Sequence, residues 1–275
     1  MALGGVPYYL NYVEKGLSAA ENIQNIFFDN KAPLKKEFSK LFSSLFNEAE
    51  AYIELIKLIS QKKEGLSRAE IEVQSKLSPG GGRLTTRLHD LEHTSFIEAH
   101  TPWDKQKGKY FKVVDEFSLF YMYWLSSKKS KKLPENYWLK QIEKPIYHVW
   151  AGYAFESICY KHIDKIVKAL HIKTAENISA WRLIPKNDNE EGAQIDLLID
   201  RSDDAITICE IKYTDAVFSI DKRYAENLRR KIKVFTEKTQ TKKQIFLAII
   251  SANGLKQNDY SEELISNTVT LDDLF

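Results

Sequence analysis

Apolar residues within the first 48 positions recur at the spacing of one helix face. They are Ile23, Ile26, Phe27, Leu41, Leu45 and Phe46. Positions three or four apart lie on the same side of an α-helix, so this spacing favours helices over strands. We therefore expect residues 1–48 to form a helical, lid-like segment, which opens with Gly4-Gly5-Val6-Pro7-Tyr8-Tyr9-Leu10.

Residues 49–127 alternate helical spacing with strong chain breaks. Ser67 and Glu70 have the spacing of a capping box, in which each side chain accepts a hydrogen bond from the other residue's backbone amide at a helix start. Beyond that helix the pattern predicts a glycine-rich break, a third helix and two strands. These elements are residues 79–82, 83–93, 95–100 and 109–115. Three helices followed by a hairpin describe a winged helix-turn-helix.

The aromatic run from Phe117 to Trp124 predicts a further helix packed on the winged helix. A polar, basic stretch follows, which reads Ser126-Ser127-Lys128-Lys129-Ser130-Lys131-Lys132. Such a stretch has little apolar surface to bury, and it is typical of a solvated connection. We expect residues 128–148 to be a linker, and a phosphate clamp is the alternative for its lysines.

The last part of the chain, residues 149–275, mixes one helical pattern with several strand patterns. The expected helices cover residues 149–170 and 221–238. The expected strands cover residues 179–184, 194–200, 205–213, 243–250 and 269–271. The order αβββαβ makes the whole chain an α+β protein with several domains.

Composition supports a folded chain of ordinary globular type. Its 275 residues are 43% hydrophobic, and its net charge is only +2, which excludes the strong positive field of a nucleic-acid coat protein. No apolar run approaches the roughly 18 residues of a membrane span, and the N-terminus lacks a signal-peptide pattern. Cys159 and Cys209 stand in apolar contexts without neighbouring metal-ligand spacing. We expect a cytoplasmic protein with two buried thiols and no membrane partner.

Three acidic residues and one lysine carry the candidate chemistry. Glu210 and Lys212 stand two apart on an expected strand, which places both on one face. Asp196 lies within an apolar strand, and Glu156 lies on the preceding apolar helix. Carboxylates brought close together need a cation, and Mg²⁺ (or Mn²⁺) prefers oxygen ligands of this kind. Lys212 would then orient or help deprotonate an attacking water.

These residues resemble the PD-(D/E)xK nuclease superfamily. Asp196, followed after thirteen residues by Glu210-Ile211-Lys212, stands within an αβββαβ order that carries Glu156 on its first helix. The resemblance implies that Asp196 and Glu210 are metal ligands, that Lys212 is the catalytic lysine and that Glu156 is an accessory ligand. Ile195 stands where the name-giving motif has proline. The implied activity is hydrolysis of phosphodiester bonds in DNA.

The whole chain resembles the C-terminal half of prokaryotic AAA+ ATPases of the archaeal-ATPase type. The Gly4–Leu10 stretch, the winged helix, Trp150-x-Gly152-x-x-Phe155-Glu156 and residues 194–200 carry this resemblance, together with the end Val269–Phe275. It implies an ATPase partner or an ATPase module that precedes this part. No G-x-x-x-x-G-K-[ST] motif occurs, so we expect no ATPase activity from this chain.

Basic residues at two places suggest contacts with nucleic acid, most simply duplex DNA. Arg83, Arg87, Lys105, Lys107 and Lys109 have the positions of recognition-helix and wing contacts, although Asp90, Glu92 and Asp104 dilute the charge. The expected helix after the carboxylates carries Arg223, Arg229, Arg230, Lys231 and Lys233, which can form a face that grips a phosphate backbone or a plain solvated face.

The alternatives are a surface ion pair in place of the metal site and a protein-binding role for the winged helix. Two functions follow: a metal-dependent nuclease, and a non-catalytic DNA- or protein-binding adaptor half of an ATPase.

Overall fold

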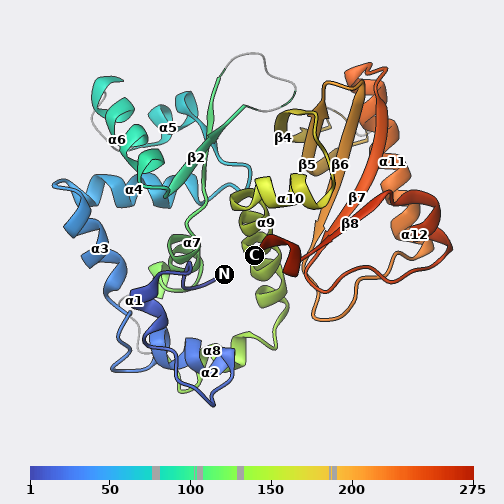
Figure 1. Ribbon diagram of the computed structural model, residues 1–275. Coiled ribbons are helices and arrows are strands. Elements are labelled where there is room, and N and C mark those ends of the chain that lie inside the picture. The colour runs from blue at the N-terminus through green and yellow to red at the C-terminus, as the bar shows by residue number, and fades with distance from the viewer. Residues whose placement is uncertain (76–80, 102, 104–107, 129–132, 186, 188–190) are drawn as a thin grey trace. The chain divides into compact units, whose positions relative to one another are not determined.

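The structure is a computed structural model that describes residues 1–75, 81–101, 103, 108–128, 133–185, 187 and 191–275. These residues form an α+β protein, which confirms the expected class (Figure 1). The described part holds twelve α-helices, a three-stranded antiparallel sheet and a five-stranded mixed sheet. The chain divides into two compact units: unit 1 comprises residues 1–100 and 108–158, and unit 2 comprises residues 101–107 and 159–275.

Unit 1 is mainly helical. Its helices are α1 (Pro7–Leu10), α2 (Ala19–Ile23), the π-helical turn η1 (Gln24–Phe28), α3 (Glu37–Leu45), α4 (Ala49–Ile59), α5 (Arg68–Gln74), α6 (Gly81–His93), α7 (Glu116–Trp124), the short 3₁₀ turn η2 (Ser126–Lys128), α8 (Tyr137–Gln141) and most of α9 (Pro145–Lys161). Its strands are β1 (Leu66–Ser67), β2 (Ile97–His100) and β3 (Tyr110–Val113).

The capping box predicted at the start of α5 is confirmed. The Ser67 hydroxyl accepts from the Glu70 amide at 3.2 Å, and the Glu70 carboxylate accepts from the Ser67 amide at 2.8 Å. Lys62 donates to the same carboxylate, and these bonds lower the pKa of Glu70 to about 2. Two of the helix-start amides are thereby satisfied, which fixes where α5 begins.

The three-stranded sheet has the order β1-β3-β2 and pairs Ile97 with Val113. Strand β1 was not predicted, because two residues are too few to show a period of two. Gly65 precedes it with a φ of +79°, and a Cβ there would lie 2.2 Å from the carbonyl oxygen of Phe111. Only glycine lets the chain pass this close to β3.

Aromatic side chains fill the core of unit 1 and extend into the stretch expected to be a linker. Trp138 of α8 is buried, lies 5.1 Å from the ring centroid of Trp124 in an edge-on arrangement, and donates its backbone amide to Gln24. Helix α9 begins within the same stretch, at Pro145. The free energy gained by burying these large rings favours folded helices over the solvated linker that the preceding polar run suggested. Residues 137–148 are therefore helical except for a short turn.

Unit 2 contains the larger sheet. Its helices are the end of α9, α10 (Ile163–Ala169), α11 (Lys222–Thr239) and α12 (Asp259–Leu264), with a closing 3₁₀ turn η3 (Asp272–Leu274). Its strands are β4 (Ala175–Leu183), β5 (Ala193–Arg201), β6 (Ala205–Lys212), β7 (Gln244–Ser251) and β8 (Asn267–Thr270). The single helix predicted over residues 149–170 was wrong in one respect, because the chain leaves helical geometry at His162 between α9 and α10. The short helix α12 was not predicted.

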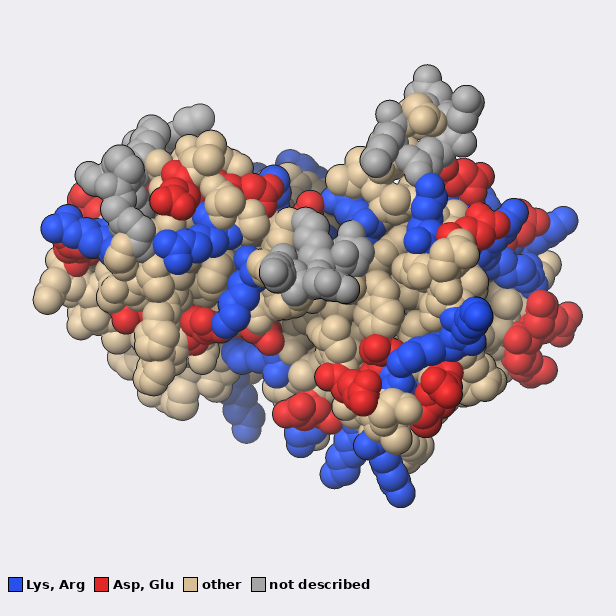
Figure 2. Space-filling model, turned by 90° about the horizontal axis from the view of Figure 1, so that it is seen from above, with Lys and Arg blue, Asp and Glu red and all other residues tan. Residues whose placement is uncertain are grey.

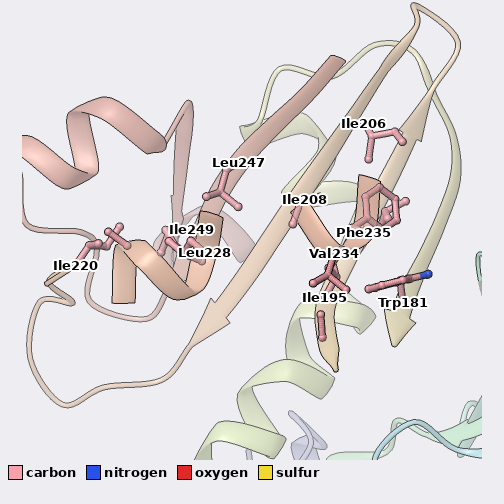
Figure 3. Close-up of a cluster of buried hydrophobic side chains, with 13 residues drawn as sticks. Trp181, Ile195, Ile206, Ile208, Ile220, Leu228, Val234, Phe235, Leu247 and Ile249 are labelled. Atoms are coloured by element: carbon pink, nitrogen blue, oxygen red, sulfur yellow. The ribbon is translucent and has the colours of Figure 1, made fainter. Parts of the chain in front are cut away.

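The five strands follow the order β4-β5-β6-β7-β8. The first three run antiparallel, whereas β7 runs parallel to β6 and β8 runs parallel to β7. A parallel neighbour requires a crossover connection, and α11 supplies it between β6 and β7. Figure 3 shows the apolar core that the sheet and α11 share. Its labelled side chains are Trp181, Ile195, Ile206, Ile208, Ile220, Leu228, Val234, Phe235, Leu247 and Ile249.

The two cysteines, Cys159 and Cys209, are buried as predicted and form no disulfide. Within the described ranges, none of the helices has the length and apolar character needed to cross a bilayer.

Candidate active site

The predicted acidic residues of unit 2 lie on neighbouring antiparallel strands. Leu197 of β5 pairs with Cys209 of β6, and continuing that register by one residue sets Asp196 opposite Glu210. Residues directly opposite each other in an antiparallel pair project to the same face. The same alternation along β6 puts Glu210 and Lys212 on the face of Ile206 and Ile208, which packs on α11.

A bulge in β5 occurs at Asp196. Between the pairs Ser179–Leu198 and Trp181–Ile195, β4 advances by two residues while β5 advances by three. In a regular strand Ile195 and Leu198, three residues apart, would project to opposite faces. Because of the additional residue, both side chains belong to the core cluster that packs on α11. Bulges bend a strand locally and re-aim its side chains. Here the bulge turns a carboxylate toward the core-facing side of an apolar strand.

Asp196 is buried and held by backbone and side-chain donors. Its Oδ2 accepts from the Ile211 amide at 3.2 Å, and its Oδ1 accepts from Gln194 Nε2 at 3.4 Å. The Tyr160 hydroxyl donates to the Asp196 carbonyl oxygen at 2.6 Å. The hydrogen bond from Ile211 therefore joins the Asp196 carboxylate to the peptide group between Glu210 and Ile211.

Glu210 is fully buried and contacts two ammonium groups and a phenol. Lys231 Nζ lies 2.5 Å from Oε1, whereas the Tyr224 hydroxyl donates to Oε2 at 3.1 Å and Lys212 Nζ lies 3.6 Å from the same oxygen. Burial of a carboxylate without such partners is costly. The two ammonium groups and the phenol supply the partners that the burial of Glu210 requires.

Tyr224 and Lys212 complete the site. Burial, followed by the negative charge of Glu210, raises the pKa of Tyr224 far above its usual value, so its hydroxyl remains a donor. Lys212 is less enclosed, with 29% of its side chain exposed, and its Nζ lies 5.3 Å from the Tyr224 ring centroid. Burial likewise raises the pKa of Cys209, which makes that thiol unreactive.

The donor set suits a hard divalent cation. Asp196 and Glu210 offer carboxylate oxygens, and Mg²⁺ binds commonly through one or two carboxylates while it keeps several waters. Binding at Glu210 Oε1 requires Lys231 to withdraw from that oxygen. Among the described residues, no group of three or more His, Cys, Asp or Glu is arranged to hold a metal. Within the described part of unit 2, Asp196 and Glu210 thus stand as a pair of carboxylates and not as part of a larger cluster of this kind.

Glu156, the third predicted ligand, has other partners within unit 1. Its carboxylate forms ion pairs with Lys63 and with Lys112, the latter at 3.5 Å. Burial lowers the pKa of Lys112, and Glu156 opposes that shift. The tertiary fold gives this glutamate an ion-pairing role, and its role as a metal ligand stays a prediction.

The basic residues predicted to contact nucleic acid in the winged helix differ in their exposure. Arg83 is exposed, as expected. The expected exposure of Arg87 was wrong, because its guanidinium pairs with Glu48 at 2.5 Å and leaves only 11% of the side chain accessible. Lys105 and Lys107 lie outside the described residues, while Lys109 is exposed.

Two arginines of α11 predicted to contact nucleic acid form hydrogen bonds with neighbouring residues. Arg229 forms a double hydrogen bond with Glu263, and Arg230 donates to the Gly192 carbonyl oxygen and to Asn227. On the face drawn in Figure 2, the described acidic and basic side chains are interspersed, without a continuous field of one sign. These arginines stabilise α11 against its neighbours.

Two residues that contact Glu210 were not recognised as site residues from the sequence: Tyr224, and Lys231, which was grouped with the outer basic face. Both align with the buried stripe of α11, since Tyr224, Leu228, Lys231 and Phe235 recur at intervals of four, three and four. A lysine at a core-facing position was the available signal. The structure turns Lys231 inward because Glu210 provides its counter-ion.

Residues 120–232 match a protein family, DUF234, described as archaeal and bacterial proteins of unknown function. The match begins in α7 and ends in α11, so it includes Asp196, Glu210 and Lys212. No curated protein matches the chain. Over less than half of its length the chain is therefore similar to that family, and its function must be argued from the site.

Proposed function

We propose that unit 2 is a PD-(D/E)xK-like nuclease domain that hydrolyses phosphodiester bonds in DNA with Mg²⁺ or Mn²⁺. The observation that carries the proposal is the buried pair Asp196 and Glu210 on adjacent strands, with Lys212 3.6 Å from Glu210. Three antiparallel strands followed by a helix and a parallel strand support it as well. If Glu210 only formed ion pairs with lysines, a second buried carboxylate at Asp196 would not be needed beside it.

Each residue has a distinct task in this reaction. Asp196 and Glu210 would hold the cation, which when bound would stabilise charge on the scissile phosphate. Lys212 orients the attacking water and balances the charge that develops as the water–phosphorus bond forms. The attacking water would release a proton to solvent as its bond to phosphorus forms. The phosphorus–ester bond would then break, and the departing alkoxide would take a proton from solvent. Tyr224 fixes Glu210 through its hydrogen bond.

The proposal for unit 1 is a winged helix that binds duplex DNA. Three helices and a small antiparallel sheet, in the order α4-α5-α6-β2-β3, support it, together with the exposed Arg83 on α6. An ATPase partner or a preceding ATPase module would fit the resemblance of the whole chain to AAA+ proteins. Two buried thiols without a disulfide agree with action in a reducing cytoplasm.

The experiment combines metal binding with cleavage. Calorimetric titration with Mn²⁺ and a nicking assay on supercoiled plasmid should give saturable binding and metal-dependent nicking for the wild-type chain. Asp196→Asn and Glu210→Gln should each lose both properties. Asp203→Asn is the matched control, because this exposed carboxylate in the turn after β5 pairs with Arg201 away from the site. Loss of nicking in the control as well as in the two site variants would show that the assay reports folding rather than the site.

One observation favours a second function, a non-catalytic adaptor half of an ATPase. Lys231 and Lys212 already neutralise Glu210 without a metal. A wild-type chain that binds no divalent ion and cuts neither DNA nor RNA, while it still binds DNA or a protein partner, would replace the nuclease by the adaptor.

A further inference from the structure

Unit 1 contains a cavity of about 450 Å³ that the sequence did not reveal. Its walls come from the end of α4 and the following turn, from β3, α7 and η2, and from α9. The volume falls within the roughly 300–1,000 Å³ range of small-molecule sites. All of its lining residues belong to unit 1, so this site is separate from the carboxylate pair of unit 2.

The polar part of the lining is strongly basic. Lys57, Lys62, Lys63 and Lys112 line the cavity, and the described lining includes no acidic residue. Two carboxylates from outside the lining bind three of these ammonium groups: Glu70 binds Lys62 at 2.9 Å, and Glu156 binds Lys63 and Lys112. Four lysines set against these two carboxylates leave an excess of positive charge, which favours an anionic ligand.

The apolar part of the lining is aromatic. Tyr123, Trp150 and Tyr153 stand around the cavity together with Leu119 and Met122. Tyr123 and Tyr153 are substantially exposed, at 37% and 45%. Large rings left accessible beside a basic cavity offer a stacking surface for a flat ligand.

We propose that this cavity binds a nucleoside phosphate, with the phosphate at the lysines and the planar base against the tyrosines. The ligand is either a free nucleotide or one nucleotide of a single strand, since both present the same chemistry. The inference goes beyond the nuclease proposal and does not depend on it, because the lysines and rings belong to unit 1.

The test uses the full chain with adenosine 5′-monophosphate, inorganic phosphate and single-stranded oligo(dA) as separate probes. Quenching of tryptophan fluorescence, checked by calorimetry, should show saturable binding of the nucleotide and weaker binding of phosphate alone. Tyr153→Ala should weaken nucleotide binding about tenfold through lost stacking. Lys57→Gln should weaken it severalfold and reduce its salt dependence. The more tightly bound of the nucleotide and oligo(dA) identifies the source.

Lys40→Gln provides the matched control, because Lys40 is an exposed lysine of unit 1 outside the cavity lining. It should leave binding unchanged. Circular dichroism confirms that each variant is folded, and Lys57→Gln, at an exposed position, keeps the test valid if Tyr153→Ala unfolds. Absence of saturable binding for both nucleotide probes at millimolar concentration, or equal affinities in wild type, Tyr153→Ala and Lys57→Gln, would overturn the proposal.

Discussion

Among the residues that the structure describes, each unit contains a cluster of buried carboxylates and lysines. In unit 1 the carboxylate of Glu156 meets Lys63 and Lys112 beside a cavity lined by further lysines. In unit 2 the carboxylates of Asp196 and Glu210 stand on adjacent strands, and Lys212 and Lys231 contact Glu210. Lysines therefore outnumber carboxylates in the cluster of unit 1, whereas the cluster of unit 2 has two of each. An excess of lysine around a hollow favours an anion, whereas a carboxylate pair favours a cation.

The largest expected effect is on unit 1. Glu156→Gln removes the carboxylate that Lys63 and the buried Lys112 share, and loss of one partner of a buried ion pair costs about 3–5 kcal/mol. Urea unfolding should show this loss. Binding of Mn²⁺ by the folded variant should be unchanged if Glu156 belongs to the anion site alone. Loss of Mn²⁺ binding in folded Glu156→Gln would instead make Glu156 a ligand and join the two clusters in one function.

The next effect concerns turnover in unit 2. Lys212 acts on water and on developing charge rather than on the metal, so Lys212→Ala should lower the nicking rate by about a hundredfold. Its affinity for Mn²⁺ should change little, as calorimetry would show. A variant that loses metal affinity as well as rate would contradict the separation of tasks between Lys212 and the carboxylates.

A smaller effect is expected at Lys231, whose ammonium lies on Glu210 Oε1. Lys231→Met removes a cation that competes for this oxygen, so Mg²⁺ should bind severalfold more tightly. The buried carboxylate also loses a counter-ion, and Mg²⁺ should therefore raise the melting temperature of the variant more than that of the wild type. Thermal scans with and without Mg²⁺ measure both. Unchanged Mg²⁺ affinity would count against a metal at Glu210.

The smallest effect separates the two arginines of α6. Arg83 is exposed, and Arg83→Ala should weaken binding of duplex DNA severalfold and reduce the slope of log affinity against log salt by about one. Arg87 is directed to Glu48, so Arg87→Ala should leave the slope unchanged. Fluorescence anisotropy with a labelled duplex at several salt concentrations tests this. A slope for Arg83→Ala equal to that of the wild type would exclude a DNA contact through Arg83.

The sequence by itself determined the local features of this protein. The capping box at Ser67 and Glu70 formed as predicted, because its hydrogen bonds join residues three apart. The period of two along β6 predicted that Glu210 and Lys212 share a face, and their head groups lie 3.6 Å apart. Most strands and helices were foreseen for the same reason, since their patterns are set by neighbours along the chain.

Only the tertiary structure decided which distant groups became partners. Arg87 forms an ion pair with Glu48, and Lys231 forms one with Glu210. Glu156 forms ion pairs with both Lys63 and Lys112. None of these pairs follows from a spacing, because each charge is placed by the packing of separate elements. The cavity of unit 1 depends in the same way on several elements that close around it. A buried charge takes the counter-ion that the fold brings within reach, since leaving it unpaired in a medium of low dielectric is costly.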